Sequence, residues 1–181
     1  MQEFVQEILI SDAQIQQRVS ELGAQISLDY AGKEILLLCI LKGGVIFLAD
    51  LAKSITVPLE MDFMAVSSYG SATHSSGVVK IVKDLEESIE GKHVLIVEDI
   101  IDTGLTLKYL IENLKQRQPA SLKIVALFDK PDNRAVDILV DYSGFIIPNK
   151  FIVGYGLDYR QFYRNVPYIF VPNPEKDPRD R

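Results

Sequence analysis

The chain has 181 residues, and 48% of them are hydrophobic, so it is long enough for one domain with a full core. Its 25 acidic and 19 basic residues give a net charge of −6, which argues against nucleic acid as the main partner, because binding to a phosphate backbone normally requires a basic surface. It has neither an apolar N-terminal segment typical of a signal peptide nor a run of about 18 apolar residues, so we expect a cytoplasmic protein with no membrane contact.

The N-terminal part of the sequence predicts a helix, a strand, a second helix and a second strand. Ser11-Asp12-Ala13-Gln14 is a capping-box pattern, and apolar residues at helical spacing continue from it to Ile26. Residues 35–41 are a continuous apolar run that predicts a buried strand, and this strand leads into a helix over residues 45–54. Residues 61–67 predict the next strand.

A polar loop rich in glycine and serine follows over residues 69–77, and residues 78–82 predict a short strand beyond it. Small polar residues make such a loop mobile, and a mobile loop beside a ligand site can admit ligands and then exclude water. We therefore expect a lid that begins at Ser68 and Tyr69. The alternative is a hairpin loop without a function.

The rest of the sheet is predicted from the remaining apolar runs. Residues 94–97, 122–128 and 137–140 predict strands, and an amphipathic helix between the first two carries its apolar face over residues 107–114. Apolar strands that alternate with amphipathic helices predict an α/β fold with a mostly parallel, twisted sheet that is flanked by helices.

The sequence becomes irregular and rich in aromatic residues from Tyr142 onward. We interpret this part as a small hood subdomain over the carboxyl edge of the sheet, built from the N-terminal segment and residues 142–172. Residues 173–181 are rich in proline and charge and are expected to be a frayed tail. The prediction is therefore a single domain over residues 1–181.

The most informative stretch is Val94–Leu107, in which a β-branched run ends in Glu98 and Asp99 and is followed by Asp102-Thr103-Gly104-Leu105-Thr106. A strand, a loop of small residues and a helix N-terminus form a natural anion site, because the loop and helix-end N–H groups lack internal partners. Two carboxylates would repel a phosphate unless they bind something else, and sugar hydroxyls fit that role. We therefore expect the loop to hold a 5′-phosphate while Glu98 and Asp99 accept hydrogen bonds from a ribose.

This stretch resembles the ribose-phosphate-binding motif of the type I phosphoribosyltransferases. An ordinary strand–loop–helix unit with solvated acids would leave the spacing of the motif unexplained. The resemblance implies phosphoribosyl pyrophosphate as a substrate and Mg²⁺ as a cofactor, with Glu98, Asp99 and Asp158 as candidate metal ligands. Some relatives carry lysine where this chain has Leu105, so the phosphate would be held here by backbone amides, Thr103 and Thr106.

Two further segments resemble the same family. Leu41-Lys42-Gly43-Gly44 resembles the loop that contacts pyrophosphate, although alone it would be read equally well as a plain strand-to-helix turn. Residues 151–159 resemble the hood segment of the hypoxanthine-guanine phosphoribosyltransferases. The resemblance implies that Phe151 stacks on a purine, that the Ile152 backbone meets the base edge, and that Arg164 contacts pyrophosphate.

Two residues are candidates for the chemistry of the base. The resemblance implies that Asp102 is the general base for the proton on purine N7, although an aspartate here could also cap the helix that follows. It implies that Lys130 donates to the 6-oxygen of the purine, whereas a lysine at a strand end is more often solvated. A donor at this point selects a carbonyl over an amino group.

The resemblance as a whole implies a 6-oxopurine phosphoribosyltransferase of the hypoxanthine(-guanine) type, which forms a homodimer or a homotetramer. Two alternatives stay open. One is a regulator on the same fold that binds RNA or DNA, which the net charge of −6 argues against. The other is a phosphoribosyltransferase for xanthine or a pyrimidine. Lys130 and the segment from Phe151 to Asp158 favour a purine but do not separate guanine from xanthine.

Overall fold

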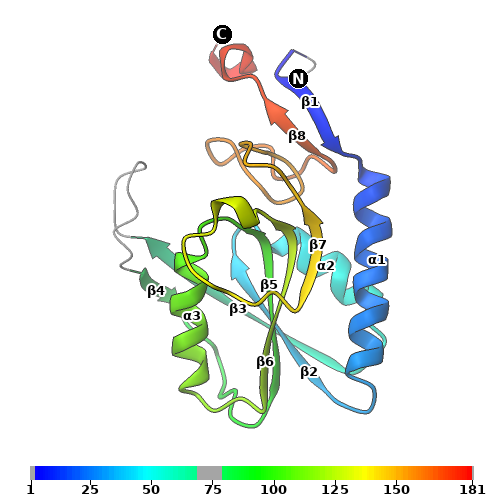
Figure 1. Cartoon of the computed structure of the whole chain (residues 1–181), viewed down its shortest axis with the longest axis vertical. Coiled ribbons are helices and arrows are strands. Elements are labelled where there is room, and N and C mark those ends of the chain that lie inside the picture. Colours follow the sequence, from blue (N-terminus) through cyan, green and yellow to red (C-terminus); the bar gives the residue numbers. More distant parts are fainter. Residues whose placement is uncertain (1–2, 69–78, 181) are drawn as a thin grey trace.

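A computed structural model of the chain describes residues 3–68 and 79–180 (Figure 1). Within these residues the main sheet has six strands in the order β4-β3-β2-β5-β6-β7. Neighbouring strands are parallel, except that β4 lies antiparallel to β3 at one edge. The strands are β2 (Ile35–Leu41), β3 (Leu59–Ser68), β4 (Val79–Lys83), β5 (His93–Ile101), β6 (Ser121–Asp129) and β7 (Tyr142–Ile146). The predicted α/β fold with a mostly parallel sheet is confirmed.

Helices cover both faces of this sheet. α1 (Asp12–Asp29) and α2 (Val45–Ser54) pack on one face, and α3 (Leu105–Lys115) packs on the other. Successive side chains of a strand point to opposite faces, and a strand covered on both faces must therefore be apolar throughout. In β2, Leu37 and Cys39 pack with α1 and α2, whereas Leu36 and Leu38 pack with α3. No helix within the described residues is long and apolar enough to cross a membrane.

The predicted start of the first helix is confirmed in detail. The Ser11 side chain accepts a hydrogen bond from the Gln14 N–H at 3.3 Å, and the Ser11 N–H donates to Gln14 Oε1 at 2.9 Å. These bonds complete a capping box, which satisfies two backbone groups that a helix end otherwise leaves unpaired. The predicted strand over residues 35–41 and helix over residues 45–54 have the observed bounds.

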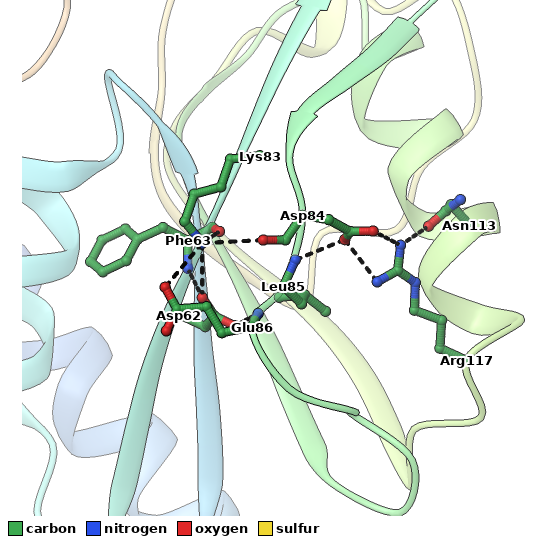
Figure 2. A network of polar contacts seen from close by, with 8 residues as sticks. All are labelled: Asp62, Phe63, Lys83, Asp84, Leu85, Glu86, Asn113 and Arg117. Atoms are coloured by element: carbon green, nitrogen blue, oxygen red, sulfur yellow. Dashed lines mark hydrogen bonds and ion pairs between the residues drawn. The ribbon is translucent and has the colours of Figure 1, made fainter.

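Polar contacts fix the connection between β4 and β5 (Figure 2). Lys83 Nζ donates to the Phe63 carbonyl oxygen at 2.9 Å and pairs with Asp62 at 3.5 Å, which ties β4 to β3. The Arg117 guanidinium donates to both oxygens of Asp84, at 2.8 and 2.9 Å, and so ties the connection to the end of α3. The predicted polar loop over residues 69–77, with Tyr69 of the expected lid, lies outside the described residues; Ser68 is the last residue of β3.

The hood lies above the carboxyl ends of the parallel strands (Figure 1). β1 (Val5–Ile10) pairs antiparallel with β8 (Ile169–Pro172), so the two ends of the chain meet in one small sheet. A separate apolar cluster of Phe4, Val153, Val166 and Phe170 stabilises the hood. This cluster is independent of the two clusters that flank the main sheet.

Two expectations for the second half of the chain are wrong. Residues 137–140 do not form a strand, because Ile138 and Val140 pack against the α3 side of the core and the Asp141 carboxylate takes the Ile124 N–H at 2.9 Å. A strand over residues 137–140 would need that N–H group for its own backbone hydrogen bonds with β6. Instead, β7 joins β6 from Tyr142 onward, so the hood is smaller than expected and begins after Ile146.

The expected frayed tail is also wrong for residues 174–180. They form two 3-10 turns, Pro174–Lys176 and Pro178–Asp180. The Asp177 side chain is buried and pairs with the Arg179 guanidinium at 2.5 Å, which holds the pKa of this carboxyl well below its usual range. Arg179 also lies 4.4 Å above the ring of Phe162 in the hood. An ion pair and a cation–π contact therefore hold the tail against the hood.

Candidate active site

The predicted functional residues gather at the carboxyl ends of β2, β5 and β6, beneath the hood (Figure 1). Ligands of open α/β sheets bind at this edge, because the loops and helix N-termini of neighbouring strands meet there. Lys42 and Gly43 follow β2, Asp102 follows β5 and Lys130 follows β6. The sheet order places β5 between β2 and β6, so the acidic motif lies at the centre of the site.

Glu98 and Asp99 lie within β5 rather than just after it, because the strand continues to Ile101. Their side chains therefore point to opposite sides of the strand. Glu98 lines a pocket with the loop that follows β5, whereas the Asp99 carboxylate lies against Gly43. Two acids that are adjacent in the sequence thus face two different parts of the site. A shared role in holding a ribose stays a prediction.

Both carboxyls have a raised pKa in the absence of a ligand. Burial raises the pKa of Glu98 well above its usual value, and the charge of Asp99 raises it further. Burial also raises the pKa of Asp99, to about 6, although the Ile100 N–H and the Arg164 guanidinium oppose this shift. Hydroxyl donors or a cation would stabilise the charged forms. The pair is therefore suited to a ligand that brings such groups.

The loop after β5 forms the opposite wall of the Glu98 pocket. Gly104 precedes α3 with a φ of +79°, in the left-handed region that favours glycine, and a β-carbon there would lie 2.8 Å from Ile138 Cδ1. The first N–H groups of α3 have no partner within the helix and face this end. The pocket has a volume of about 150 Å³ and is lined by Glu98, Ile100, Ile101, Asp102, Thr103, Gly104, Thr106 and Leu107.

On the Asp99 side, an arginine and two acids come together. Arg164 Nη2 lies 2.7 Å from Asp158 Oδ1, and Arg164 Nη1 donates to the Gly156 carbonyl oxygen at 2.7 Å. The charge of Arg164 also acts on Asp99. The hood segment that carries Arg164 and Asp158 presses on the loop after β2, since a β-carbon at Gly156 would overlap with the Gly43 carbonyl oxygen. We call Arg164, Asp158, Asp99 and Gly43 the arginine cluster.

Lys42 lies at the edge of this cluster. Its peptide bond with Leu41 is cis. The Lys42 Nζ group donates to Gln161 Oε1 at 3.4 Å, a contact that links the loop after β2 to the hood. The Lys42 side chain is exposed, so its charge is available to an anionic ligand. The predicted contacts of Lys42 and Gly43 with pyrophosphate stay predictions.

Lys130 is buried, which excludes the alternative of a solvated lysine. It is 6% exposed, its Nζ donates to the Lys150 carbonyl oxygen at 2.7 Å, and its N–H donates to the Ile101 carbonyl oxygen at 3.0 Å. Phe151, the next residue after Lys150, is 59% exposed rather than part of the core. Ile152 is buried. An exposed aromatic side chain one residue after the carbonyl group that binds a buried ammonium group is suited to a flat heterocycle that accepts a hydrogen bond.

Two residues in contact with the site are not predicted by the sequence. Arg134 pairs with Asp129 in a largely buried ion pair, and Asn133 Nδ2 donates to Asp102 Oδ1. Both residues follow Lys130-Pro131 in a 3-10 turn region. Their sequence, Pro-Asp-Asn-Arg, is typical of any turn, so it contains no signal that separates these contacts from ordinary turn chemistry.

The side chains at this edge are suited to Mg²⁺ only if a substrate completes the ligand set. Within residues 3–68 and 79–180, no three His, Cys, Asp or Glu side chains lie close enough together to hold a metal ion alone. Asp99 and Asp158 provide carboxylate oxygens on either side of Arg164. Mg²⁺ is commonly bound by one or two carboxylates together with substrate phosphates and water. The carboxylates present fit that mode.

Comparison with known proteins agrees with this fold and site. Residues 6–160 match the phosphoribosyl transferase domain family, and the chain belongs to this family. It is 53% identical over 174 residues to the hypoxanthine-guanine phosphoribosyltransferase of Bacillus subtilis (strain 168), a match that covers 96% of this chain and 97% of that protein. The crystal structure of a hypoxanthine phosphoribosyltransferase from Staphylococcus aureus superimposes with a TM-score of 0.93 at 51% identity and covers 97% of this chain and 95% of that chain.

A longer relative matches over the same region. The bifunctional protein TilS/HprT of Listeria monocytogenes serotype 4b (strain F2365) is 52% identical over 171 residues, or 94% of this chain. The chain spans only 26% of the length of that relative. The expected membership in the phosphoribosyltransferases, a family of transferases, is therefore confirmed.

Proposed function

We propose that this protein is a purine-salvage enzyme that transfers the 5-phosphoribosyl group from phosphoribosyl pyrophosphate to hypoxanthine and guanine. The products are IMP or GMP and pyrophosphate. One observation carries the proposal: Glu98 and four residues that follow β5, Asp102, Thr103, Gly104 and Thr106, line a single pocket at the carboxyl edge of the sheet. This pocket has helix-end amides for a phosphate on one wall and a carboxylate for sugar hydroxyls on the other.

The donor would lie across the motif of β5. Its 5′-phosphate binds the backbone amides of the loop, Thr103 and Thr106, since Leu105 offers no charge. The ribose hydroxyls donate to Glu98 and Asp99, whose burial favours a ligand with hydrogen-bond donors. The pyrophosphate group extends toward Lys42, Gly43 and the arginine cluster.

The base would lie between Phe151 and the Lys130 ammonium group. Phe151 stacks on the purine plane, and the Ile152 backbone meets the edge of the base. Lys130 donates to the 6-oxygen, because its Nζ already lies at the backbone of the same hood segment. An amino group at this position would place two donors face to face, so adenine is disfavoured.

In the transfer, the C1′–O bond to pyrophosphate breaks and its electron pair leaves with the pyrophosphate. The N9 lone pair of the base forms the new bond to C1′, and the proton on N7 passes to Asp102. Arg164 and Lys42 stabilise the charge that develops on the leaving group. Carboxylates among Glu98, Asp99 and Asp158 would hold Mg²⁺ together with the substrate, and the ion would supply further positive charge for the leaving group.

The remaining expectations belong to the same proposal. The protein would act in the cytoplasm as a homodimer or homotetramer, and residues 1–181 would form one catalytic domain. Ser68 and Tyr69 would begin a lid that excludes water, which could otherwise hydrolyse the donor.

The test is turnover followed by absorbance with hypoxanthine, guanine, xanthine and adenine, each with and without Mg²⁺. We expect Mg²⁺-dependent formation of IMP and GMP and little reaction with adenine. Efficient turnover of xanthine alone would move the protein to another substrate class. Binding of phosphoribosyl pyrophosphate without turnover of any base would instead support a regulator on this fold, and RNA or DNA binding would then be measured.

A further inference from the structure

A chain of two side-chain amides leads to the carboxylate of Asp102. Asn133 Nδ2 donates to Asp102 Oδ1, and Asn133 Oδ1 accepts a hydrogen bond from Asn149 Nδ2 at 3.4 Å. An ionised carboxylate can only accept, so the nitrogen end of the Asn133 amide must face Asp102 and its oxygen end is left for Asn149. Each amide group in the chain is therefore oriented by its neighbour.

The backbone holds Asn133 in place relative to Asp102. The Lys130 N–H donates to the Ile101 carbonyl oxygen at 3.0 Å, and the Ala135 N–H donates to the Thr103 carbonyl oxygen at 2.9 Å. These two bonds bracket Asp102 on one segment and Asn133 on the other. A side chain that is bound between two fixed backbone segments loses little entropy when it makes its hydrogen bond.

The same chain connects Asp102 with the residues that would contact the base. Asn149 immediately precedes Lys150, whose carbonyl oxygen accepts the hydrogen bond from Lys130 Nζ at 2.7 Å. Phe151 follows directly. The turn after β6 and the start of the hood segment are thus joined by two side-chain contacts, one through Lys130 and one through Asn133.

We propose that Asn133 is a positioning residue that holds the Asp102 carboxylate in the orientation needed to take the purine proton. The inference rests on the proposed function. Asp102 is exposed and would otherwise occupy several side-chain rotamers. The bond from Asn133 occupies Oδ1 and leaves Oδ2 for the proton. Because the donor is a neutral amide, it orients the carboxylate without forming an ion pair that would oppose proton uptake.

The test is a double-mutant cycle with Asn133→Ala and Asp102→Asn. We expect Asn133→Ala to lower kcat about tenfold, at the low end of the contribution of a hydrogen bond to a charged group, with an unchanged KM for phosphoribosyl pyrophosphate. In the Asp102→Asn background the same change should have no further effect, because no carboxylate remains to be oriented. A purely structural role would lower kcat by the same factor in both backgrounds, and that result would overturn the proposal.

Two variants separate the hydrogen bond from the shape of the turn. Asn133→Asp keeps the size of the side chain but sets a carboxylate against Asp102, so it should lower kcat at least as far as the alanine variant. Asp132→Ala changes the exposed neighbouring residue of the same 3-10 turn and should leave turnover unchanged. A fall with Asp132→Ala equal to that with Asn133→Ala would also overturn the proposal, because it would show that any change in the turn has this effect.

Crystal structures of the wild-type protein and the Asn133→Ala variant test the inference without turnover. We expect the Asp102 carboxylate to be ordered in the wild type and to rotate or adopt several conformers in the variant. An unchanged carboxylate would overturn the positioning role. If the wild-type protein fails to turn over any 6-oxopurine, the proposed function is wrong, and the catalytic purpose of the Asn133 contact is overturned with it even where the carboxylate rotates.

Discussion

The Asp99 carboxylate fills the space beside Gly43, so that a β-carbon on residue 43 would overlap with Asp99 Oδ2. Asp99 lies within β5 and Gly43 lies in the loop after β2, so their contact joins the acidic motif to that loop. Glycine is therefore required at position 43 for the carboxylate to reach its place.

Gly43→Ala should displace Asp99 and weaken the donor site. We expect the Kd for phosphoribosyl pyrophosphate to rise at least about tenfold, because the half-buried carboxylate would no longer meet the ribose. The measurement is isothermal titration calorimetry with Mg²⁺ present. Gly32→Ala is the matched control: its φ of +75° makes the variant less stable by about 1 kcal/mol, but no atom lies within 4 Å of the added carbon and donor affinity should not change. Unaltered donor binding by Gly43→Ala would contradict the role of Asp99.

Arg164→Ala removes the cation of the arginine cluster. Because a preorganised group that stabilises developing charge typically contributes about 3 kcal/mol, kcat should fall about 100-fold. Arg164→Lys should recover only part of this loss, since lysine keeps the charge but lacks the planar fork that contacts Asp158 and Gly156 together. Steady-state kinetics are the measurement. The control is Arg160→Ala, which removes an exposed guanidinium of the hood; a loss as large as that of Arg164→Ala would point to a general effect on the hood.

Lys130→Ala tests the selection of a 6-oxygen. The ratio of kcat/KM for hypoxanthine to that for unsubstituted purine should fall at least about tenfold, because only hypoxanthine accepts a hydrogen bond from the ammonium group. Competition between the two bases in one reaction gives this ratio directly. An equal loss for both bases would show that the buried lysine acts through the fold. Thermal unfolding of the variant then measures that structural part.

The contact between Asp84 and Arg117 predicts a pH dependence of stability (Figure 2). Hydrogen bonds from the Arg117 guanidinium hold the pKa of Asp84 below its usual value of 3.8. A carboxyl whose pKa is lowered in the folded state stabilises the protein above the unfolded pKa, and this stabilisation is lost as the pH falls through the folded pKa.

Asp84→Asn should therefore lower Tm by about 2 °C at pH 7, because a half-exposed ion pair contributes at most about 1 kcal/mol and solvent screens it. The difference from the wild type should shrink as the pH falls below about 4 and vanish once the pH lies below the folded pKa. Scanning calorimetry from pH 7 downward is the measurement, with Glu112→Gln on α3 as the control for loss of an exposed charge. A difference that grows toward low pH would contradict the assignment.

The sequence predicts those parts of the fold in which local pattern and tertiary position agree. The strand at residues 35–41 and the acidic motif are recognisable because a strand buried on both faces must be apolar, and the change to acids marks its carboxyl end. Asp137–Val140 shows the limit of this reasoning. Its apolar residues are buried, but the Asp141 side chain takes the N–H of Ile124 that a strand would need, and no local pattern predicts that competition.

The site shows the same division. The residues from Asp102 to Thr106 are consecutive and follow a recognisable strand, so the sequence alone places them together in the loop at its carboxyl end. The Lys130 ammonium group is bound by the carbonyl oxygen of Lys150 at the start of the hood, and the contact of Asn133 with Asp102 joins two loops that are 31 residues apart, so neither could be read from local sequence. The tail differs from its expected state for a similar reason: proline and charge indicate solvent exposure, but the Asp177–Arg179 pair packs on aromatic residues of the hood.

The pairing of β1 with β8 determines which parts of the fold can form first while the chain is being synthesised. Residues 5–10 precede every strand of the main sheet in the chain, and their partners at 169–172 follow all of them. All six strands of the main sheet precede Phe151, so the sheet can form while the chain is still growing. The small sheet of β1 and β8, by contrast, can close only after residues 169–172 have been translated, so a nascent chain stopped before Ile169 would have the floor of the site but an unclosed hood.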